Sequence, residues 1–256
     1  MATLLFIPTY NESENVERLH DQIGALGLDI DILFMDDGSP DGTGEILDRV
    51  AARAPRTTVV HRPGKLGVGS AHRAGIRYAY AKGYTTLVTM DSDFTHSPAR
   101  IVEFLGHAHD SDVVLGSRFL RAESLAGWSP TRTFLTHLGH FLTRTLLRIP
   151  FDATGGFRVY RLDRIERRLF DLTSSDGYAF FFEILFMLCR AGAVVKELPI
   201  DLPKRFYGHS KMKRSDVVAS LRTLAALFIG WPRTTRAIRA FRAKAVVPLS
   251  ARADDL

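Results

Sequence analysis

The first half of the chain alternates between short apolar runs and longer segments with helical periodicity. The apolar runs cover residues 4–7, 30–35, 57–60, 85–90 and 112–116. The segments between them have the spacing of amphipathic helices and cover 13–26, 41–53, 68–82 and 98–108. Near-continuous apolar strands that alternate with helices indicate an α/β fold, with a mostly parallel sheet and helices on both of its faces.

The second half contains longer amphipathic elements. Helices are predicted at 132–148, 178–191 and 215–230, and strands at 155–160 and 194–200. The segment from residue 232 is basic and then polar. We therefore expect one domain over 1–231, with halves 1–120 and 121–231, followed by a poorly ordered tail over 232–256.

The net charge is +6, and the basic excess is uneven. The first 60 residues lean acidic, whereas 203–244 is rich in Lys and Arg. This asymmetry favours an anionic partner, such as a phosphate, a nucleic acid or a lipid surface, although a solvated basic face would look the same.

Cys189 is the only cysteine, which excludes an internal disulfide and is typical of a reducing compartment. The first residues lack the basic start and long apolar run of a signal peptide. No stretch holds roughly 18 uninterrupted apolar residues, so we expect no membrane-spanning helix and a cytoplasmic location.

Polar clusters follow four of the predicted strands. They occupy 8–12, 36–39, 91–93 and 116–118. Ligands of open α/β sheets bind outside the carboxyl ends of the strands, so the four clusters predict one binding site at this edge.

Two aspartates, Asp91 and Asp93, follow the strand 85–90 with one residue between them. On extended backbone their side chains leave the same face, where they repel each other unless a cation lies between them. Mg²⁺ and Mn²⁺ prefer oxygen ligands and are often held by one or two carboxylates and a substrate phosphate. A metal site is favoured over a helix cap with a solvated acid.

The second acidic pair, Asp36 and Asp37, is placed to accept hydrogen bonds from a ribose or a base. Capping of the next helix by Ser39 or Asp41 is the simpler interpretation of this cluster. The Gly-rich stretch 63–70 leads into a helix and is expected to hold phosphate there, with Lys65 as the counter-charge.

Other site classes are excluded by their missing motifs. The stretch 63–70 lacks the Gly-Lys-Ser/Thr ending of a P-loop, and no Gly-rich turn follows the first strand as in dinucleotide-binding enzymes. The sequence also lacks Gly-x-Ser-x-Gly and His-Glu-x-x-His.

The motifs taken in order resemble the family 2 glycosyltransferases of GT-A fold, and within them the dolichol- or polyprenol-phosphate mannose synthases. The matching motifs are PTYNE at 8–12, DDGSPDGT at 36–43, KLG at 65–67 with Gly75, DSD at 91–93 with His96 and Pro98, GSR at 116–118, GFR at 156–158 and GHSKM at 208–212. The resemblance spans about residues 3–213.

This resemblance implies a metal-dependent, inverting transfer of a hexose, in particular mannose from GDP-mannose, to a polyprenyl or dolichyl monophosphate. It implies that 1–120 binds the nucleotide sugar and 121–231 binds the acceptor. The implied nucleotide contacts are Pro8, Tyr10, Glu12, Asp37, Lys65, Asp91 and Ser92. The implied ligands of Mg²⁺ or Mn²⁺ are Asp91, Asp93 and Thr95, where Thr95 replaces the family's glutamine. The implied acceptor-phosphate ligands are Arg118, Arg132, Thr136, Arg205 and Lys211. The implied catalytic residues are Asp93, Arg118, Arg132 and Glu183.

Elementary chemistry agrees with a phosphate acceptor, which is already anionic and needs charge neutralisation rather than a general base. Basic side chains that fit such an acceptor lie at 118, 132, 144, 158, 204, 205 and 211. The segments 132–148 and 221–231 are apolar enough to lie on a membrane surface, as a peripheral protein of the cytoplasmic face would.

Two alternatives remain open. The same fold accepts another donor, such as a UDP-sugar, and a soluble hydroxyl acceptor, for which Glu183 is the candidate base. A non-catalytic nucleotide- or nucleic-acid-binding protein is the second. The acidic edge of the sheet opposes a nucleic-acid backbone, and no aromatic stacking platform is apparent, so we expect no nucleic-acid partner.

Overall fold

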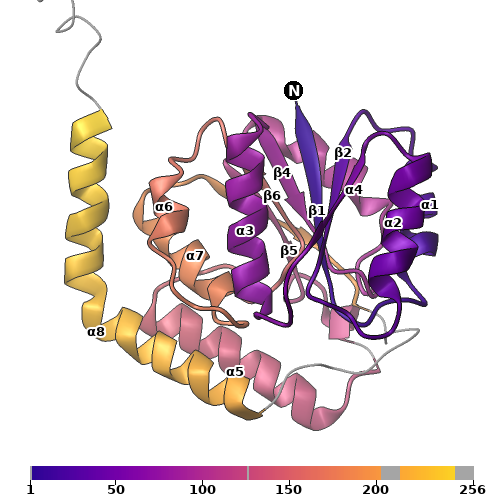
Figure 1. Cartoon of the computed structure of the whole chain (residues 1–256). Helices are drawn as coiled ribbons and strands as arrows, with labels where there is room; N and C mark the ends of the chain where they lie inside the picture. The colour runs from indigo at the N-terminus through magenta and orange to yellow at the C-terminus, as the bar shows by residue number, and fades with distance from the viewer. Residues whose placement is uncertain (1, 126, 203–213, 246–256) are drawn as a thin grey trace, which may run out of the picture.

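The computed structural model describes residues 2–125, 127–202 and 214–245, which build one sheet with helices on both faces (Figure 1). The strands in chain order are β1 (Thr3–Thr9), β2 (Asp31–Asp36), β3 (Thr57–His61), β4 (Thr86–Thr89), β5 (Val113–Ser117), β6 (Arg158–Arg161) and β7 (Val195–Pro199). The helices are α1 (Val16–Gly24), α2 (Thr43–Arg53), α3 (Val68–Ala81), α4 (Arg100–Gly106), η1 (His107–His109), η2 (Ala122–Leu125), α5 (Pro130–Leu146), α6 (Arg168–Asp171), α7 (Phe180–Arg190) and α8 (Arg214–Ala245). Every strand and helix predicted from the sequence is present, with small shifts of the ends except in α8, which extends well beyond its predicted end at residue 230. Helix α6 and the two short 3₁₀ turns were not predicted.

The strands are ordered β3-β2-β1-β4-β6-β5-β7, and β6 alone runs antiparallel to its two neighbours within the described sheet. The mostly parallel sheet expected from the sequence is therefore confirmed. The direction of β6 follows from the position of α5, which lies at the carboxyl edge of the sheet (Figure 1). The chain enters β6 from that edge, so the strand must run back against the others.

Two apolar layers, one on each face of the sheet, form the core. Strand β1 supplies both, because its side chains alternate between the faces. Leu4 and Phe6 pack with α3 and α7, and Leu5 and Ile7 pack with the opposite layer that contains α1, α2 and α4. Gly75 lets α3 approach the sheet closely, because a Cβ there would lie 2.5 Å from the ring of Phe6.

Helix α5 and the first part of α8 lie across the end of the sheet toward which β1 runs, and the rest of α8 runs back along the side (Figure 1). Phe134 and Phe141 of α5 are 64% and 60% exposed, and Ile229 of α8 is 78% exposed. The described part of the chain contains no helix that is both long and apolar enough to cross a membrane. The carboxyl edge of the sheet is therefore flanked by an exposed apolar surface.

The domain boundary expected at residue 231 falls inside α8, which continues to Ala245. Residues 232–245, expected to belong to a poorly ordered tail, are thus helical; residues 246–256 lie outside the described chain. The helix contains Pro232 and bends along its length (Figure 1). Proline removes one backbone hydrogen bond and displaces the preceding turn, which accounts for the bend.

Candidate active site

Asp36 ends β2 and holds together the loops that follow β1 and β2. Its carboxylate accepts hydrogen bonds from the backbone N–H of Ser39 at 3.0 Å and from the Thr9 hydroxyl at 3.2 Å. The Ser39 hydroxyl in turn accepts the N–H of Asn11 at 2.9 Å. Asp36 therefore builds the edge of the site, and its oxygens already have donors from the chain itself.

The Asp41 carboxylate lies just before α2, whose N-cap residue is Gly42 and has no side-chain cap, so neither Ser39 nor Asp41 is the N-cap. The carboxylate accepts the N–H of Thr43 at 3.1 Å and the N–H of Ser13 at 3.1 Å. Burial opposes ionisation, but these hydrogen bonds lower the pKa of Asp41. The Thr43 hydroxyl accepts the N–H of Glu12 at 2.9 Å, and the Glu12 carboxylate accepts the side chain of Asn15 at 2.7 Å. Glu12 is thus fixed at the entrance to α1, beside the edge of the sheet.

Asp37, the second acid of the pair, is buried between β2 and the loop after β3. Its carboxylate accepts Nη1 of Arg62 at 2.7 Å and the N–H of Leu66 at 3.2 Å. Burial raises the pKa of Asp37, and Arg62 opposes this shift. Lys65 from the same loop places its ammonium 4.4 Å from the ring centroid of Tyr10. The structure therefore brings together three of the predicted nucleotide contacts, and it adds Arg62, a basic residue directly after β3 that belongs to none of the sequence motifs.

The prediction that the helix after the Gly-rich stretch 63–70 holds phosphate is wrong for the amides that begin α3. The N–H groups of Gly69 and Ser70 donate to the carbonyl of Asp176 at 2.7 and 3.2 Å. A Cβ on Gly67 would lie 2.4 Å from the same carbonyl oxygen. These glycines therefore let a loop of the second half of the chain close over the start of α3, and that loop takes the place of a ligand.

Asp91 and Asp93 follow β4, and the chain holds them differently. Asp93 is buried, and its Oδ1 accepts both the hydroxyl of Thr95 at 2.5 Å and the N–H of Thr95 at 3.1 Å. Asp91 is partly exposed, with 39% of its side chain accessible. Between them, Ser92 is buried and donates its hydroxyl to the carbonyl of Pro8 at 3.5 Å. The loops after β1 and β4 are thus joined at the predicted metal and nucleotide site.

The residues around Asp91 and Asp93 fit a divalent cation that is shared with a substrate. Across 2–125, 127–202 and 214–245, no three His, Cys, Asp or Glu side chains are grouped as a complete metal site. Two carboxylates plus the oxygens of a diphosphate are the usual ligand set of Mg²⁺. Gly156 leaves space beside Asp91, because a Cβ there would lie 3.3 Å from Oδ1 of Asp91. The buried Nδ1 of His96 lies 3.8 Å from Oδ2 of Asp91 and has no hydrogen bond among the described residues.

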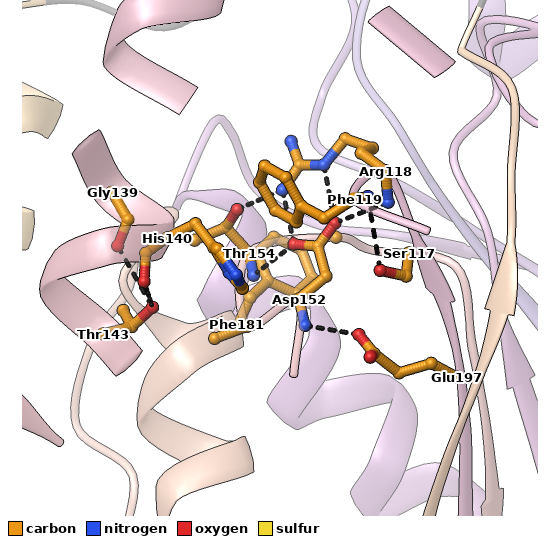
Figure 2. A network of polar contacts seen from close by, with 12 residues as sticks. Ser117, Arg118, Phe119, Gly139, His140, Thr143, Asp152, Thr154, Phe181 and Glu197 are labelled. Carbon is orange, nitrogen blue, oxygen red and sulfur yellow. Dashed lines mark hydrogen bonds and ion pairs between the residues drawn. The ribbon is translucent and has the colours of Figure 1, made fainter. Parts of the chain in front are cut away.

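Arg118 follows β5 and forms a buried ion pair with Asp152 (Figure 2). Its Nε and Nη2 donate to the two carboxylate oxygens of Asp152 at 2.8 and 2.6 Å, and Nη2 also contacts the hydroxyl of Thr154. Burial opposes ionisation of Asp152, but the Arg118 guanidinium lowers the pKa of this carboxyl below its usual value. Phe119 stacks on His140 of α5, with 4.0 Å between ring centroids. Arg118 is therefore held as a fixed cation at the carboxyl edge.

Arg132 lies in the first turn of α5, and its guanidinium covers the ring of Trp128 at 3.5 Å from the centroid. The Trp128 indole N–H donates to the carbonyl of Leu202 at 3.0 Å. Arg132 is thus anchored where the described chain stops at residue 202. Thr136 follows one turn later on the same side of α5. The two remaining predicted phosphate ligands lie outside the described residues, namely Arg205 and Lys211.

Glu183 lies in the first turn of α7 and is buried. Its carboxylate accepts the N–H groups of Ser174 and Ser175 at 3.0 and 2.9 Å, and the Ser174 hydroxyl at 3.2 Å. This arrangement fixes the loop that closes over α3. The geometry gives Glu183 a role in holding that loop.

Arg158, expected among the cations for the acceptor, is fully buried and faces the backbone. Its nitrogens donate to the carbonyls of Gly155 at 2.9 Å, Phe181 at 2.9 Å and Ala153 at 2.8 Å. The sequence could not separate this arginine from exposed ones, because burial depends on the tertiary fold. Arg158 therefore supports the loop behind Asp91 and is not available to an acceptor.

Comparison with known protein families matches residues 5–169 to Glycosyl transferase family 2. The chain is 36% identical over 213 residues to the undecaprenyl-phosphate mannosyltransferase of Micrococcus luteus, covering 83% of this chain and 88% of the relative. It is 35% identical over 218 residues to the polyprenol monophosphomannose synthase of Mycolicibacterium smegmatis, covering 84% and 82%.

Solved structures share the fold at lower identity. Mannosyl-3-phosphoglycerate synthase from Rubrobacter xylanophilus gives a TM-score of 0.60 at 20% identity, over 100% of this chain and 78% of that one. Glucosyl-3-phosphoglycerate synthase from Mycobacterium tuberculosis, in complex with Mn²⁺, UDP and glucosyl-3-phosphoglycerate, gives 0.57 at 21% identity, over 90% and 78%. The fold, the order of the motifs and the extent of the matches agree, and the chain belongs to glycosyl transferase family 2.

Proposed function

We propose that this glycosyltransferase transfers mannose from GDP-mannose to a polyprenyl monophosphate, with inversion at the sugar carbon. The observation that carries the proposal is the placement of Asp91 and Asp93 after β4 and of Arg118 after β5. Only β6 lies between these strands, so their ends are roughly 10 Å apart. This leaves room for a sugar between an acidic site for a metal–diphosphate and a cation for a second phosphate.

The donor half of the site rests on the ends of β1 to β4. Tyr10, Asp37 and Lys65 converge there and are proposed to hold the nucleoside, with Pro8, Glu12 and Ser92 at its border. Asp91 and Asp93 would hold Mg²⁺ or Mn²⁺, and Thr95 would orient Asp93. The Mycobacterium tuberculosis neighbour contains Mn²⁺ and UDP. A bound divalent ion supplies Lewis-acid stabilisation of the departing nucleoside diphosphate.

The acceptor half is proposed to consist of Arg118, Arg132 and Thr136, with Arg205 and Lys211 from the segment after residue 202. A phosphate oxygen forms the new bond to the sugar carbon as the bond to the nucleoside diphosphate breaks. The acceptor is already ionised near neutral pH, so the site needs to orient it and offset its charge. The two curated relatives act, by their names, on polyprenol phosphates.

Polyprenyl phosphate resides in a membrane, so we propose that the enzyme works peripherally at the cytoplasmic membrane face. Helices α5 and α8, which carry exposed apolar side chains, flank the carboxyl edge where the acceptor would enter (Figure 1). Exposed apolar patches rimmed by basic residues are typical of interfacial membrane binding.

A hydroxyl acceptor would need a general base. The candidate for this role, Glu183, already accepts three hydrogen bonds from Ser174 and Ser175. This observation favours the phosphate acceptor, and Glu183 is then a residue that positions a loop.

The direct test is transfer by the purified full chain with Mn²⁺ or EDTA present. GDP-mannose and UDP-glucose are offered as donors, each with polyprenyl monophosphate or with a soluble sugar acceptor. We expect mannosyl phosphoryl polyprenol from GDP-mannose with Mn²⁺. Transfer only from UDP-glucose, or only to the soluble hydroxyl, would overturn the proposal.

Variants of two arginines on α5 separate acceptor binding from general effects. Arg132→Ala should raise the KM for polyprenyl phosphate roughly 10-fold or more, because a hydrogen bond to a charged group contributes about 1.5–3 kcal/mol. Arg144, also among the predicted acceptor cations, lies in the last turn of α5, about three turns from Arg132; Arg144→Ala is therefore the matched control and should leave this KM unchanged. The proposal fails if Arg132→Ala leaves the KM for polyprenyl phosphate unchanged.

A further inference from the structure

The ion pair between Arg118 and Asp152 uses one edge of the guanidinium. Oδ1 and Oδ2 of Asp152 together accept the side chain of Arg118, the backbone N–H of Arg118 at 3.0 Å and the N–H of Thr154 at 3.3 Å. Among the described residues, Nη1 of Arg118 has no hydrogen-bond partner. Asp152 therefore orients the guanidinium and leaves its other edge for a ligand.

Glu197 of β7 holds the chain segment that carries Asp152 (Figure 2). Its Oε1 accepts the backbone N–H of Asp152 at 2.6 Å. Burial, and with it the nearby Asp152 charge, raises the pKa of Glu197 against the lowering effect of the Asp152 N–H and of Ser117, the residue before Arg118. The Glu197 carboxyl thus lies beside both chain segments of the pair.

The sheet explains why a residue so far along the chain reaches this place. Glu197 is paired with Leu115 across β5 and β7, two residues before Ser117. Asp152 belongs to the loop that leads from α5 into β6, on the other side of β5. Within the described chain, the N–H of Asp152 has no hydrogen-bond acceptor other than Glu197.

We propose that Glu197 is a positioning residue for the acceptor phosphate. It fixes the backbone of Asp152, Asp152 fixes one edge of Arg118, and Nη1 of Arg118 is thereby aimed at the phosphate. This role rests on the proposed function, because it assumes that Arg118 binds the acceptor. A displacement of about 1 Å in a positioning group is enough to reduce turnover ~100-fold.

The test compares Glu197→Ala with Glu197→Gln, whose amide oxygen still accepts the N–H of Asp152. Lys196→Ala is the matched control, because Lys196 is the preceding residue, its side chain leaves the opposite face of β7, and its ion pair with Asp110 is exposed. Each variant is assayed for the KM of polyprenyl monophosphate and the KM of GDP-mannose. Thermal unfolding is recorded to establish that the variants are folded.

We expect Glu197→Ala to raise the KM for polyprenyl phosphate ~10-fold or more, with the KM for GDP-mannose unchanged. Glu197→Gln and Lys196→Ala should keep both values near those of the wild type. Equal losses for donor and acceptor in Glu197→Ala, or no rescue by Glu197→Gln, would overturn the proposal.

A second measurement does not require transfer. The Nε–H of Arg118 donates to Asp152 and should give a protected NMR resonance in the wild type and in Glu197→Gln. Loss of this protection in Glu197→Ala supports positioning, and unchanged protection overturns it. If the wild type transfers to no phosphate acceptor, the proposed function fails, and with it the acceptor role of Glu197; the resonance then still shows whether Glu197 positions Arg118.

Discussion

Thr95 donates both its hydroxyl and its backbone N–H to the same oxygen of Asp93, at 2.5 and 3.1 Å. Both residues are buried. The short side chain at position 95 therefore fixes the rotamer of Asp93, in the place where the resembling enzymes carry a glutamine. A residue that holds a metal-binding carboxylate influences metal affinity without being a ligand itself.

Removal of the Thr95 hydroxyl should weaken metal binding. Thr95→Val keeps the volume but cannot donate to Asp93, so we expect the Mn²⁺ concentration for half-maximal transfer to rise ~10-fold or more. Thr95→Ser keeps the hydroxyl and should stay close to the wild type. A Mn²⁺ titration of transfer checks both variants, and equal half-maximal concentrations in Thr95→Val and the wild type would contradict this role.

Closure of the 174–177 loop over α3 should depend on Gly69. A Cβ at this position would lie 2.5 Å from the carbonyl oxygen of Ser175 and 2.7 Å from that of Gly177. Backbone atoms on both sides leave little room to relax, so Gly69→Ala should lower the free energy of unfolding by about 1–3 kcal/mol. Gly64→Ala is the matched control, since no atom lies within 4 Å of its Cβ position. Urea unfolding measures the stability of both variants. Equal urea midpoints for Gly69→Ala and Gly64→Ala would show that the loop moves aside without a loss of stability.

The fold and the edge of the site could be predicted from the sequence, because local patterns encode them. Apolar runs with helical segments between them fix the class, and acids directly after buried strands fix the edge. The individual roles of the charged residues could not be predicted from the sequence. Arg118 and Arg158 look alike in the sequence, yet one is paired with Asp152 and the other with backbone carbonyls.

The partners of these residues come from distant segments that only the tertiary fold brings together. Asp152 lies 34 positions after Arg118, and Glu197 lies 45 positions after Asp152. Each is an isolated acid without a motif of its own, although Asp152 precedes the Gly-Phe-Arg motif closely. The phosphate site predicted at the Gly-rich stretch 63–70 was wrong for the same reason. The loop that covers the start of α3 lies about a hundred residues later in the chain.

Membrane binding should depend on the exposed phenylalanines of α5. The double variant Phe134→Ser/Phe141→Ser removes two side chains that are 64% and 60% exposed. Burial of one such side chain contributes about 1.5–3 kcal/mol, so binding to phospholipid vesicles should fall at least ~10-fold. Val102→Ser on α4 is the control. Val102 is 51% exposed, but α4 packs on a face of the sheet and not at its carboxyl edge. Cosedimentation with vesicles measures the difference, and equal loss in both variants would argue against an α5 membrane surface.

His72 should make the protein sensitive to acid. The imidazole is 1% exposed and lies among Phe6, Phe180 and Phe181, with ring centroids at 5.2, 5.6 and 4.9 Å. Burial, and after it the charge of Arg158, lowers the pKa of His72 from 6.5 to about 3. The folded state therefore favours the neutral ring. Its contribution to stability is fully present above the unfolded pKa and is lost as the pH falls from about 6.5 toward 3.

The loss approaches 1.36 kcal/mol per pH unit for one proton. His72→Phe carries no titrating ring, so its free energy of unfolding should fall less steeply over this range than that of the wild type. Urea unfolding at several pH values gives the slope of the free energy of unfolding against pH. The slope is compared because a packing change from the larger ring shifts this free energy equally at every pH. His72→Leu provides a smaller replacement in case the phenyl ring does not fit. Parallel slopes in the wild type and both variants would mean that His72 takes up a proton in the folded state, and that the aromatic shell around it is more open to water than its geometry indicates.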